Sequence, residues 1–129
     1  MKLGILVNSK EALTRLSKQN LPIETSWELS KFLKEALVEI SSFESLRNNK
    51  IICYGEILKD EKGNDTDQTR VKKENEEIYK QEIIELLDKD IKIEIPLIEM
   101  KDIIEYNKKL EKKIDIQVED LLVLSWLLK

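Results

Sequence analysis

The chain has 129 residues, of which 41% are hydrophobic and 37% charged, and its formal net charge is -4 at pH 7. This length is typical of one domain, so the sequence predicts a single domain over residues 1–129. Glycine (3) and proline (2) are scarce while Glu, Lys, Leu and Ile are abundant, which favours helices. The apolar share argues against wholesale disorder, and the acidic balance argues against a domain built to bind a polyanion.

Two absences exclude further classes of function. Histidine is missing and Cys53 is the only cysteine, so the chain lacks the commonest general base and cannot supply four ligands to zinc. No apolar run approaches the roughly 20 residues that span a bilayer, and the first apolar run is too short for a signal peptide. We therefore expect a soluble, cytoplasmic protein that is not an enzyme and that has no cofactor, metal or membrane segment.

The first predicted helix covers residues 9–19. Asn8 and Glu11 have the spacing of a capping box at its start. Its apolar stripe consists of Ala12, Leu13 and Leu16. The apolar run over residues 3–7 fits either an earlier helix start or a short strand, because periodicity does not separate the two over so short a run.

The clearest signal is a long amphipathic helix over about residues 26–50. Thr25 and Glu28 have the spacing of a capping box at its start. Apolar residues then recur every three or four positions on one face, namely Leu29, Leu33, Ala36, Ile40 and Phe43, with Phe32, Leu37 and Leu46 widening the stripe. Such a helix is about 37 Å long and would cross a domain of this size. Its seam needs a partner helix from this chain or from another copy, so a homodimer through the long helix is one expectation.

The segment after the long helix predicts a short strand, a turn and a loop. Residues 56–60 fit the strand, and residues 61–64 fit the turn because Gly and Asn tolerate positive φ. Val71 is the only apolar residue in the stretch that follows, so we expect about residues 60–73 to form a mobile, exposed loop. Its acidic residues do not have the spacing of an EF-hand, and they predict no calcium site.

The second half of the sequence predicts a helix over residues 74–88 and a strand over residues 91–95, where β-branched and charged residues alternate. Residues 97–107 are ambiguous, residues 105–117 contain an uncertain charged connector, and residues 118–128 form a short apolar closing helix. Together these elements predict an α+β fold that is mainly helical. A long central amphipathic helix packs with shorter helices and with a small two- or three-stranded antiparallel sheet or hairpin.

Four residues are candidates for contact with a partner: Trp27, Lys31, Lys34 and Trp126. Tryptophan is enriched at binding hot spots, yet burial against the core explains both tryptophans, and we prefer that interpretation. The lysines extend a basic patch from the first predicted helix onto the second, which invites comparison with a helix-turn-helix. The second helix is too long and too apolar for a recognition helix and carries several glutamates, so nucleic-acid binding is the weaker interpretation.

Several motifs occur in order along the chain. They are LPIETSWELSK (21–31), YGE (54–56), DEKGN (60–64), ELL (85–87), IKIEIP (91–96) and EDLLVLSWLL (119–128). With this ordered set the chain resembles a family of small uncharacterised proteins encoded by phages and prophages of low-GC bacteria. It departs from them where Gln117 and Val118 replace a Thr-Pro pair, which gives the last helix a poorer start. The resemblance implies a phage or prophage origin and no particular activity.

These observations predict a non-enzymatic phage or prophage accessory protein that acts by protein–protein interaction. Inhibition of a host defence protein is one form of that activity. The alternatives are a phage assembly or tail accessory factor, a nucleic-acid-binding regulator, and a small enzyme that uses carboxylates alone. The expected partner is a protein of the host or the phage, or a second copy of the chain.

Overall fold

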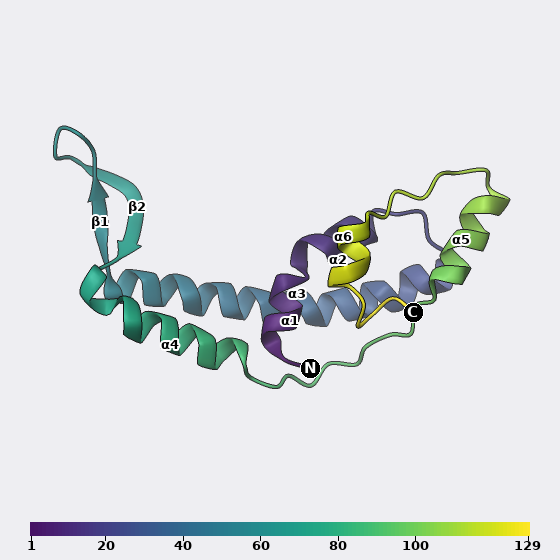
Figure 1. The fold of residues 1–129 in the computed structure, drawn as a ribbon, viewed down its shortest axis with the longest axis horizontal. Coiled ribbons are helices and arrows are strands. Elements are labelled where there is room, and N and C mark those ends of the chain that lie inside the picture. Colours follow the sequence, from purple (N-terminus) through teal and green to yellow (C-terminus); the bar gives the residue numbers. More distant parts are fainter.

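The computed structural model describes all 129 residues and shows a mainly helical α+β fold with one long helix, as predicted (Figure 1). The elements in chain order are α1 (Leu3–Asn8), α2 (Lys10–Ser17), α3 (Ile23–Tyr54), β1 (Gly55–Lys59), β2 (Asp65–Val71), the 3-10 turn η1 (Lys73–Asn75), α4 (Glu76–Leu87), α5 (Met100–Lys109) and α6 (Val118–Val123). The strands β1 and β2 form a two-stranded antiparallel hairpin. No helix combines the length and the apolar character that crossing a membrane requires.

The long helix α3 has 32 residues and extends beyond the predicted limits at both ends. It begins directly after Pro22, whose fixed φ suits a helix start, and the predicted capping box at Thr25 and Glu28 is wrong because both residues lie inside the helix. The capping box predicted at Asn8 is also wrong, since Asn8 belongs to α1. At the other end the chain leaves α3 at Gly55, where a Cβ atom would collide with the carbonyl oxygens of Ile51 and Arg70.

One face of α3 forms the centre of the core. Its predicted seam is buried at Leu29, Ala36, Ile40 and Phe43 and partly buried at Leu33. Short segments of the same chain cover most of this seam, and they contribute Leu6, Leu13, Leu16, Ile98, Ile103, Leu124 and Leu127 to the core. The seam therefore finds its partners within the chain. The predicted wider stripe is wrong at its edges, because Leu37 and Leu46 are each 48% exposed.

All three buried polar residues connect segments that are distant in sequence. The Arg15 guanidinium in α2 donates to both carboxylate oxygens of Asp120 in α6, with the shortest contact at 2.6 Å. The Ser9 hydroxyl accepts a hydrogen bond from Trp126 Nε1 at 3.2 Å, and the Asn107 amide donates to the backbone oxygen of Asn20 at 2.9 Å. Since an unpaired buried polar group is costly, these bonds fix the short segments that cover α3 relative to one another.

Residues 65–71, which were predicted to belong to a mobile loop, form the strand β2 instead. Gly55 pairs with Val71 and Ile57 with Thr69, with an irregularity before Lys59. The hairpin lies outside the core, so neither strand needs the apolar alternation that would reveal it in the sequence. The turn over residues 61–64 is confirmed, with Gly63 at a φ of 81°.

The strand predicted over residues 91–95 is absent. This stretch is extended chain with no paired strand beside it, and the nearest bridge joins Lys2 to Asp90. Ile91 and Ile93 still pack partly against the core, which accounts for the alternation of β-branched and charged residues. Farther on, the ambiguous stretch becomes α5, the connector begins only after α5 ends, and the closing helix α6 is shorter than predicted.

The molecule has two parts. The arm, defined as residues 44–87, contains the end of α3, the hairpin and α4, and no residue of it belongs to the main core. The head contains the remaining elements. Figure 1 shows α4 running back along α3 while the hairpin projects from the tip, so the arm is an antiparallel pair of helices with a hairpin at one end.

We predict that Ile40→Ala lowers the free energy of unfolding by about 2–5 kcal/mol, because it empties a fully enclosed site in the core. Leu37→Ala on the same helix is the matched control and should cost less than about 1 kcal/mol, since Leu37 is half exposed. Chemical denaturation followed by circular dichroism measures both values. Equal losses in the two variants would contradict the assigned orientation of α3.

A second prediction concerns pH. The hydrogen bonds from Arg15 hold the pKa of the Asp120 carboxyl below its ordinary value of 3.8. As the pH falls, Asp120 is therefore protonated in the unfolded chain before it is protonated in the folded protein. The stabilisation from the Asp120 carboxylate is complete above the unfolded pKa and is lost as the pH falls through the lower pKa of the folded state. Asp120→Asn should be less stable than the wild type at pH 7, and the difference should shrink below about pH 4. Thermal unfolding at several pH values tests this, and a difference independent of pH would refute it.

Candidate protein-binding surface

Trp27 lies on the solvent side of α3 and is 64% exposed. The preferred interpretation of Trp27 as a core residue is therefore wrong. The reason is its position on the helix, since Trp27 precedes the buried Leu29 by two residues and so points about 200° away from it. Ile23 lies one turn earlier on the same side and is 83% exposed. Two large apolar side chains thus stand next to each other in water at the start of α3.

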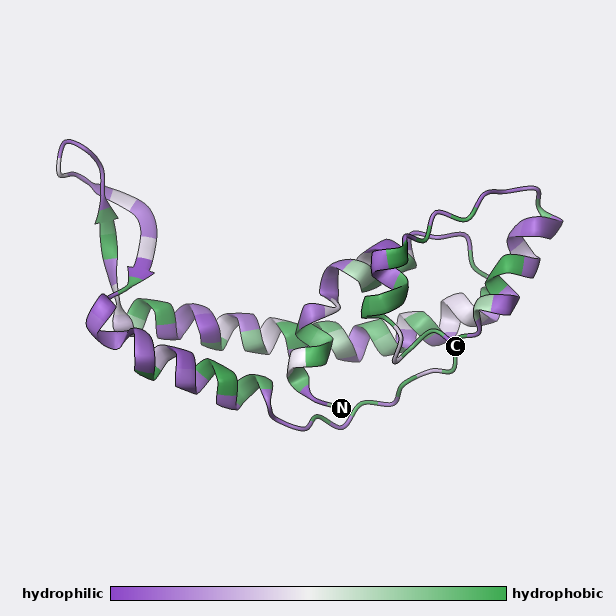
Figure 2. Ribbon diagram, in the orientation of Figure 1, coloured by the Kyte–Doolittle hydropathy of each residue, from purple (hydrophilic) through white to green (hydrophobic).

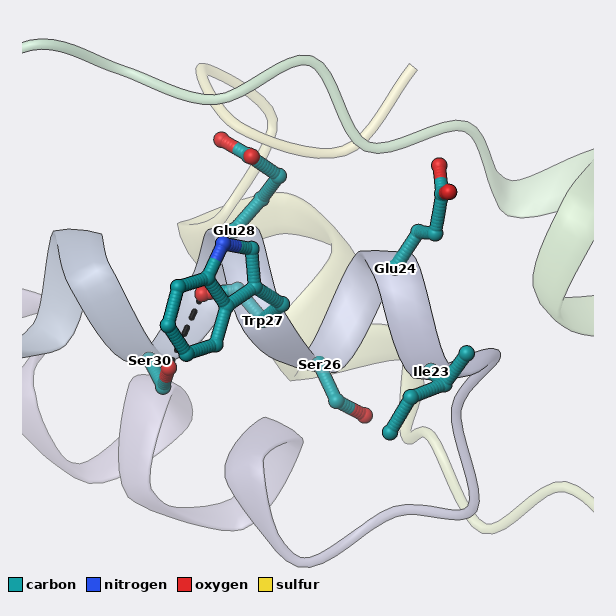
Figure 3. A pocket seen from close by; sticks show the side chains of 6 residues that line it. All are labelled: Ile23, Glu24, Ser26, Trp27, Glu28 and Ser30. Atoms are coloured by element: carbon teal, nitrogen blue, oxygen red, sulfur yellow. Dashed lines mark hydrogen bonds between the residues drawn. The ribbon is translucent and has the colours of Figure 1, made fainter.

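A shallow hollow surrounds Trp27 (Figure 3). It is lined by Ile23, Glu24, Ser26, Trp27, Glu28 and Ser30, all from the first two turns of α3. In the figure Glu24 and Glu28 point towards the extended chain that crosses beside α3. The hydroxyl of Ser30 donates to the backbone oxygen of Trp27 at 2.8 Å, so it is satisfied within the helix and needs no ligand.

Two further hollows adjoin the first across Glu24 and Glu28. The extended segment contributes Leu97, which is 74% exposed, and α5 contributes Asp102, Glu105 and Tyr106. We call the combined region the α3 N-terminal surface, defined by Ile23, Trp27 and Leu97 together with the charged residues around them. Three separate stretches of the chain build it.

Carboxylates dominate the rim of the α3 N-terminal surface. Six acidic side chains line the three hollows, Glu24, Glu28, Glu35, Glu94, Asp102 and Glu105, against two basic ones, Lys31 and Lys109. Lys31 lies 3.3 Å from Glu28 and its Nζ is 5.8 Å from the centre of the Trp27 ring. Both partners of this ion pair are more than half exposed, so it contributes little to stability. The rim has an excess of negative charge.

The structure brings together only some of the predicted contact residues. Trp27 and Lys31 lie on the α3 N-terminal surface, and Lys34 lines a neighbouring hollow with Val38. Trp126 is not part of it, because its ring packs against Phe32, with ring centres 5.7 Å apart, on the core side of α3. The interpretation of Trp126 as a residue that covers the core is confirmed.

The predicted basic patch is interrupted by ion pairs. The ammonium of Lys10 lies 2.7 Å from a carboxylate oxygen of Glu44, and its hydrogen bond lowers the pKa of Glu44. Arg15 is held by Asp120. These two basic side chains already have acidic partners, so the patch offers less free positive charge to a phosphate backbone than the sequence suggests.

The arm contains a cluster of three titratable side chains, Lys50, Tyr54 and Glu82, that are joined through Glu82. Tyr54 donates to Glu82 Oε1 at 2.8 Å, and Lys50 Nζ lies 3.1 Å from Glu82 Oε2. The bond from Tyr54 and the ion pair with Lys50 lower the pKa of Glu82, while the same contacts raise the pKa values of Tyr54 and Lys50. These shifts stabilise the resting charge states, which is the opposite of what a general acid or base needs near neutral pH. The cluster fastens α4 to α3.

No group of three or more Cys, Asp or Glu side chains is arranged to hold a metal ion. The residues that sequence reasoning missed are Ile23, Leu97 and the carboxylates around them. Ile23 and Leu97 each follow a proline, and neither belongs to the periodic apolar stripe that begins at Leu29. An apolar residue outside such a stripe is a signal of exposure that the sequence offers. Their meeting depends on the path of the extended segment, and no sequence signal gives that path.

We also compared the chain with known proteins. No protein-family model, curated protein or solved structure matches the chain.

Proposed function

We propose that this protein acts by binding another protein through the α3 N-terminal surface, as a non-enzymatic accessory factor. The observation that carries the proposal is the exposure of Trp27 beside Ile23. Exposed single apolar residues are common on protein surfaces, but a tryptophan beside a large aliphatic side chain and a polar rim has the anatomy of a binding hot spot. A partner that covers Trp27 removes a large apolar area from water.

Charge defines the chemistry of the partner. The six carboxylates of the rim favour a partner segment with basic residues around an apolar centre, since complementary charge speeds association and selects among partners. The same carboxylates repel a phosphate backbone, which argues against nucleic acid as the occupant. A basic, partly apolar protein segment fits the α3 N-terminal surface best.

The biological setting of the proposal comes from the resemblance to phage and prophage proteins. It supports a partner in the host cell or in the phage itself. A host defence protein is one candidate, and binding would then act by inhibition. Phage structural proteins as partners would instead make this chain an assembly factor.

The first test compares tagged variants in an affinity capture from nuclease-treated host lysate, with mass spectrometry of the bound proteins. Trp27→Ser should lose the partner, because truncation of a hot-spot tryptophan costs about 2 kcal/mol or more, which is roughly 30-fold in affinity. Val118→Ser is the matched control, since Val118 is a similarly exposed apolar residue on α6, outside the α3 N-terminal surface. Capture that survives Trp27→Ser, or that the control loses equally, would refute the proposed site.

A second test uses the captured partner in purified form. Reversing the charge of two rim residues, Glu24→Lys with Glu105→Lys, should slow association by about tenfold or more at low salt and reduce its salt dependence. Glu61→Lys with Asp67→Lys in the hairpin changes the net charge equally and should leave the association rate within about twofold. Surface plasmon resonance at several salt concentrations measures these rates. Equal slowing in both double variants would show that only net charge matters.

A further inference from the structure

The helix α4 has no buried residue along its 12 positions. This is unusual for its composition, since half of its residues are apolar or aromatic: Ile78, Tyr79, Ile83, Ile84, Leu86 and Leu87. By contrast, the shorter helix α2 buries three residues. Figure 2 shows hydrophobic residues along α4 with nothing packed over it on the side away from α3. The arm is therefore a layer of two helices that lacks the second layer a stable core requires.

The total accessible surface area also indicates that surface is left uncovered. The accessible surface of the chain is 9508 Å². A compact folded monomer of 15.2 kDa has about 7,100 Å², so this chain exposes roughly 2,400 Å² more than expected. A standard protein interface covers about 800 Å² on each partner. The arm projects from the head and contributes to this excess, which is large enough to include an interface of that size.

The arm is held in a fixed geometry. The hydrogen bond and ion pair to Glu82 join the middle of α4 to the end of α3, and the Asn75 side chain donates to the backbone oxygen of Tyr54 at 3.1 Å. At the other end of α4, Leu87 lies against Gly4, where an added Cβ atom would be 3.1 Å from the Leu87 backbone oxygen. Since both ends of α4 are fixed against the rest of the chain, the exposed surface of the α3–α4 pair can meet a partner with little ordering cost.

A groove that is open to solvent lies between α3 and α4. It is lined by the apolar residues Leu46, Ile83 and Leu86 and by the charged residues Lys50, Glu82, Glu85 and Lys89. We call it the arm groove. Its charges balance, two lysines against two glutamates, in contrast to the acidic α3 N-terminal surface. A strongly basic or acidic partner would therefore gain little here.

The charge pattern of the arm groove is complementary to itself. Lys50 and Glu82 are paired with each other, which leaves Glu85 in the last turn of α4 and Lys89, just after α4 ends, with no ion pair in their own chain. In a contact with two-fold symmetry, any patch meets its own copy, so Glu85 of one chain can meet Lys89 at the end of α4 in the other. A neutral, self-complementary apolar groove thus fits a second copy of this chain best.

We propose that two copies of this protein associate through their arm grooves with two-fold symmetry. The two α3–α4 pairs then form a four-helix arrangement whose centre contains Leu46 and Leu86 from both chains. The contact is separate from the α3 N-terminal surface, which lies at the opposite end of α3. The proposed dimer does not depend on whether the α3 N-terminal surface binds a partner.

Analytical ultracentrifugation of the full-length protein over a wide concentration range tests this proposal. The wild type should approach twice the 15.2 kDa mass of one chain. Leu46→Glu should raise the dimer dissociation constant by at least about tenfold, because it places a charge in the apolar centre. Ile84→Glu is the matched control, since Ile84 is exposed on α4 outside the arm groove and should remain dimeric.

A charge exchange tests the pairing without touching the apolar residues. Glu85→Lys should weaken the dimer because it brings lysines together, and Glu85→Lys with Lys89→Glu should restore it. Circular dichroism shows whether each variant is folded, and the exchange series decides the question should Leu46→Glu unfold. A wild type that remains monomeric at all concentrations would overturn the proposal. So would a dimer that Trp27→Ser dissociates, since the second copy would then occupy the α3 N-terminal surface.

Discussion

The rest of the structure depends on the contact between one face of α3 and the short segments that cover it. The helices α1, α2 and α6 have six to eight residues each, and isolated helices below about 12–15 residues are marginal in water. They persist because their apolar side chains close over the seam of α3 around Ile40. The buried bonds of Ser9, Asn107 and Asp120 then select one arrangement among the many that apolar contact alone would permit.

The head covers one face of the first part of α3 and none of its end, and the two exposed regions follow from these two facts. At the start of α3, Trp27 points towards water on the side opposite the buried Leu29, with Glu24 and Glu28 beside it. The end of α3 extends past the head and is accompanied only by α4. One helix thus carries two surfaces of different chemistry, an acidic one suited to a basic partner and a neutral one suited to its own copy.

The sequence predicted those features that depend on strong local patterns. The seam from Leu29 to Phe43 follows the helical period, and the turn at Gly63 follows from the freedom of glycine at positive φ. Features that depend on which segments meet in three dimensions were missed. The strand β2 lies away from any core and needs no apolar alternation, while residues 91–95 alternate but have no strand to pair with. Trp27 and Lys31 of the candidate site were among the residues considered from the sequence, although burial was the preferred interpretation of Trp27, whereas Leu97 becomes part of this region only through the path of the chain.

The length of α3 has a consequence for how binding surfaces are spaced. A straight helix of 32 residues measures about 48 Å, and Trp27 lies near one end while the arm groove lies near the other. In a pair joined at the arms, two copies of Trp27 are held apart by rigid helices rather than by flexible linkers. The proposed pair would therefore present its two copies of Trp27 at one fixed separation. It gains avidity for a partner whose sites repeat at that separation and gains none for isolated sites.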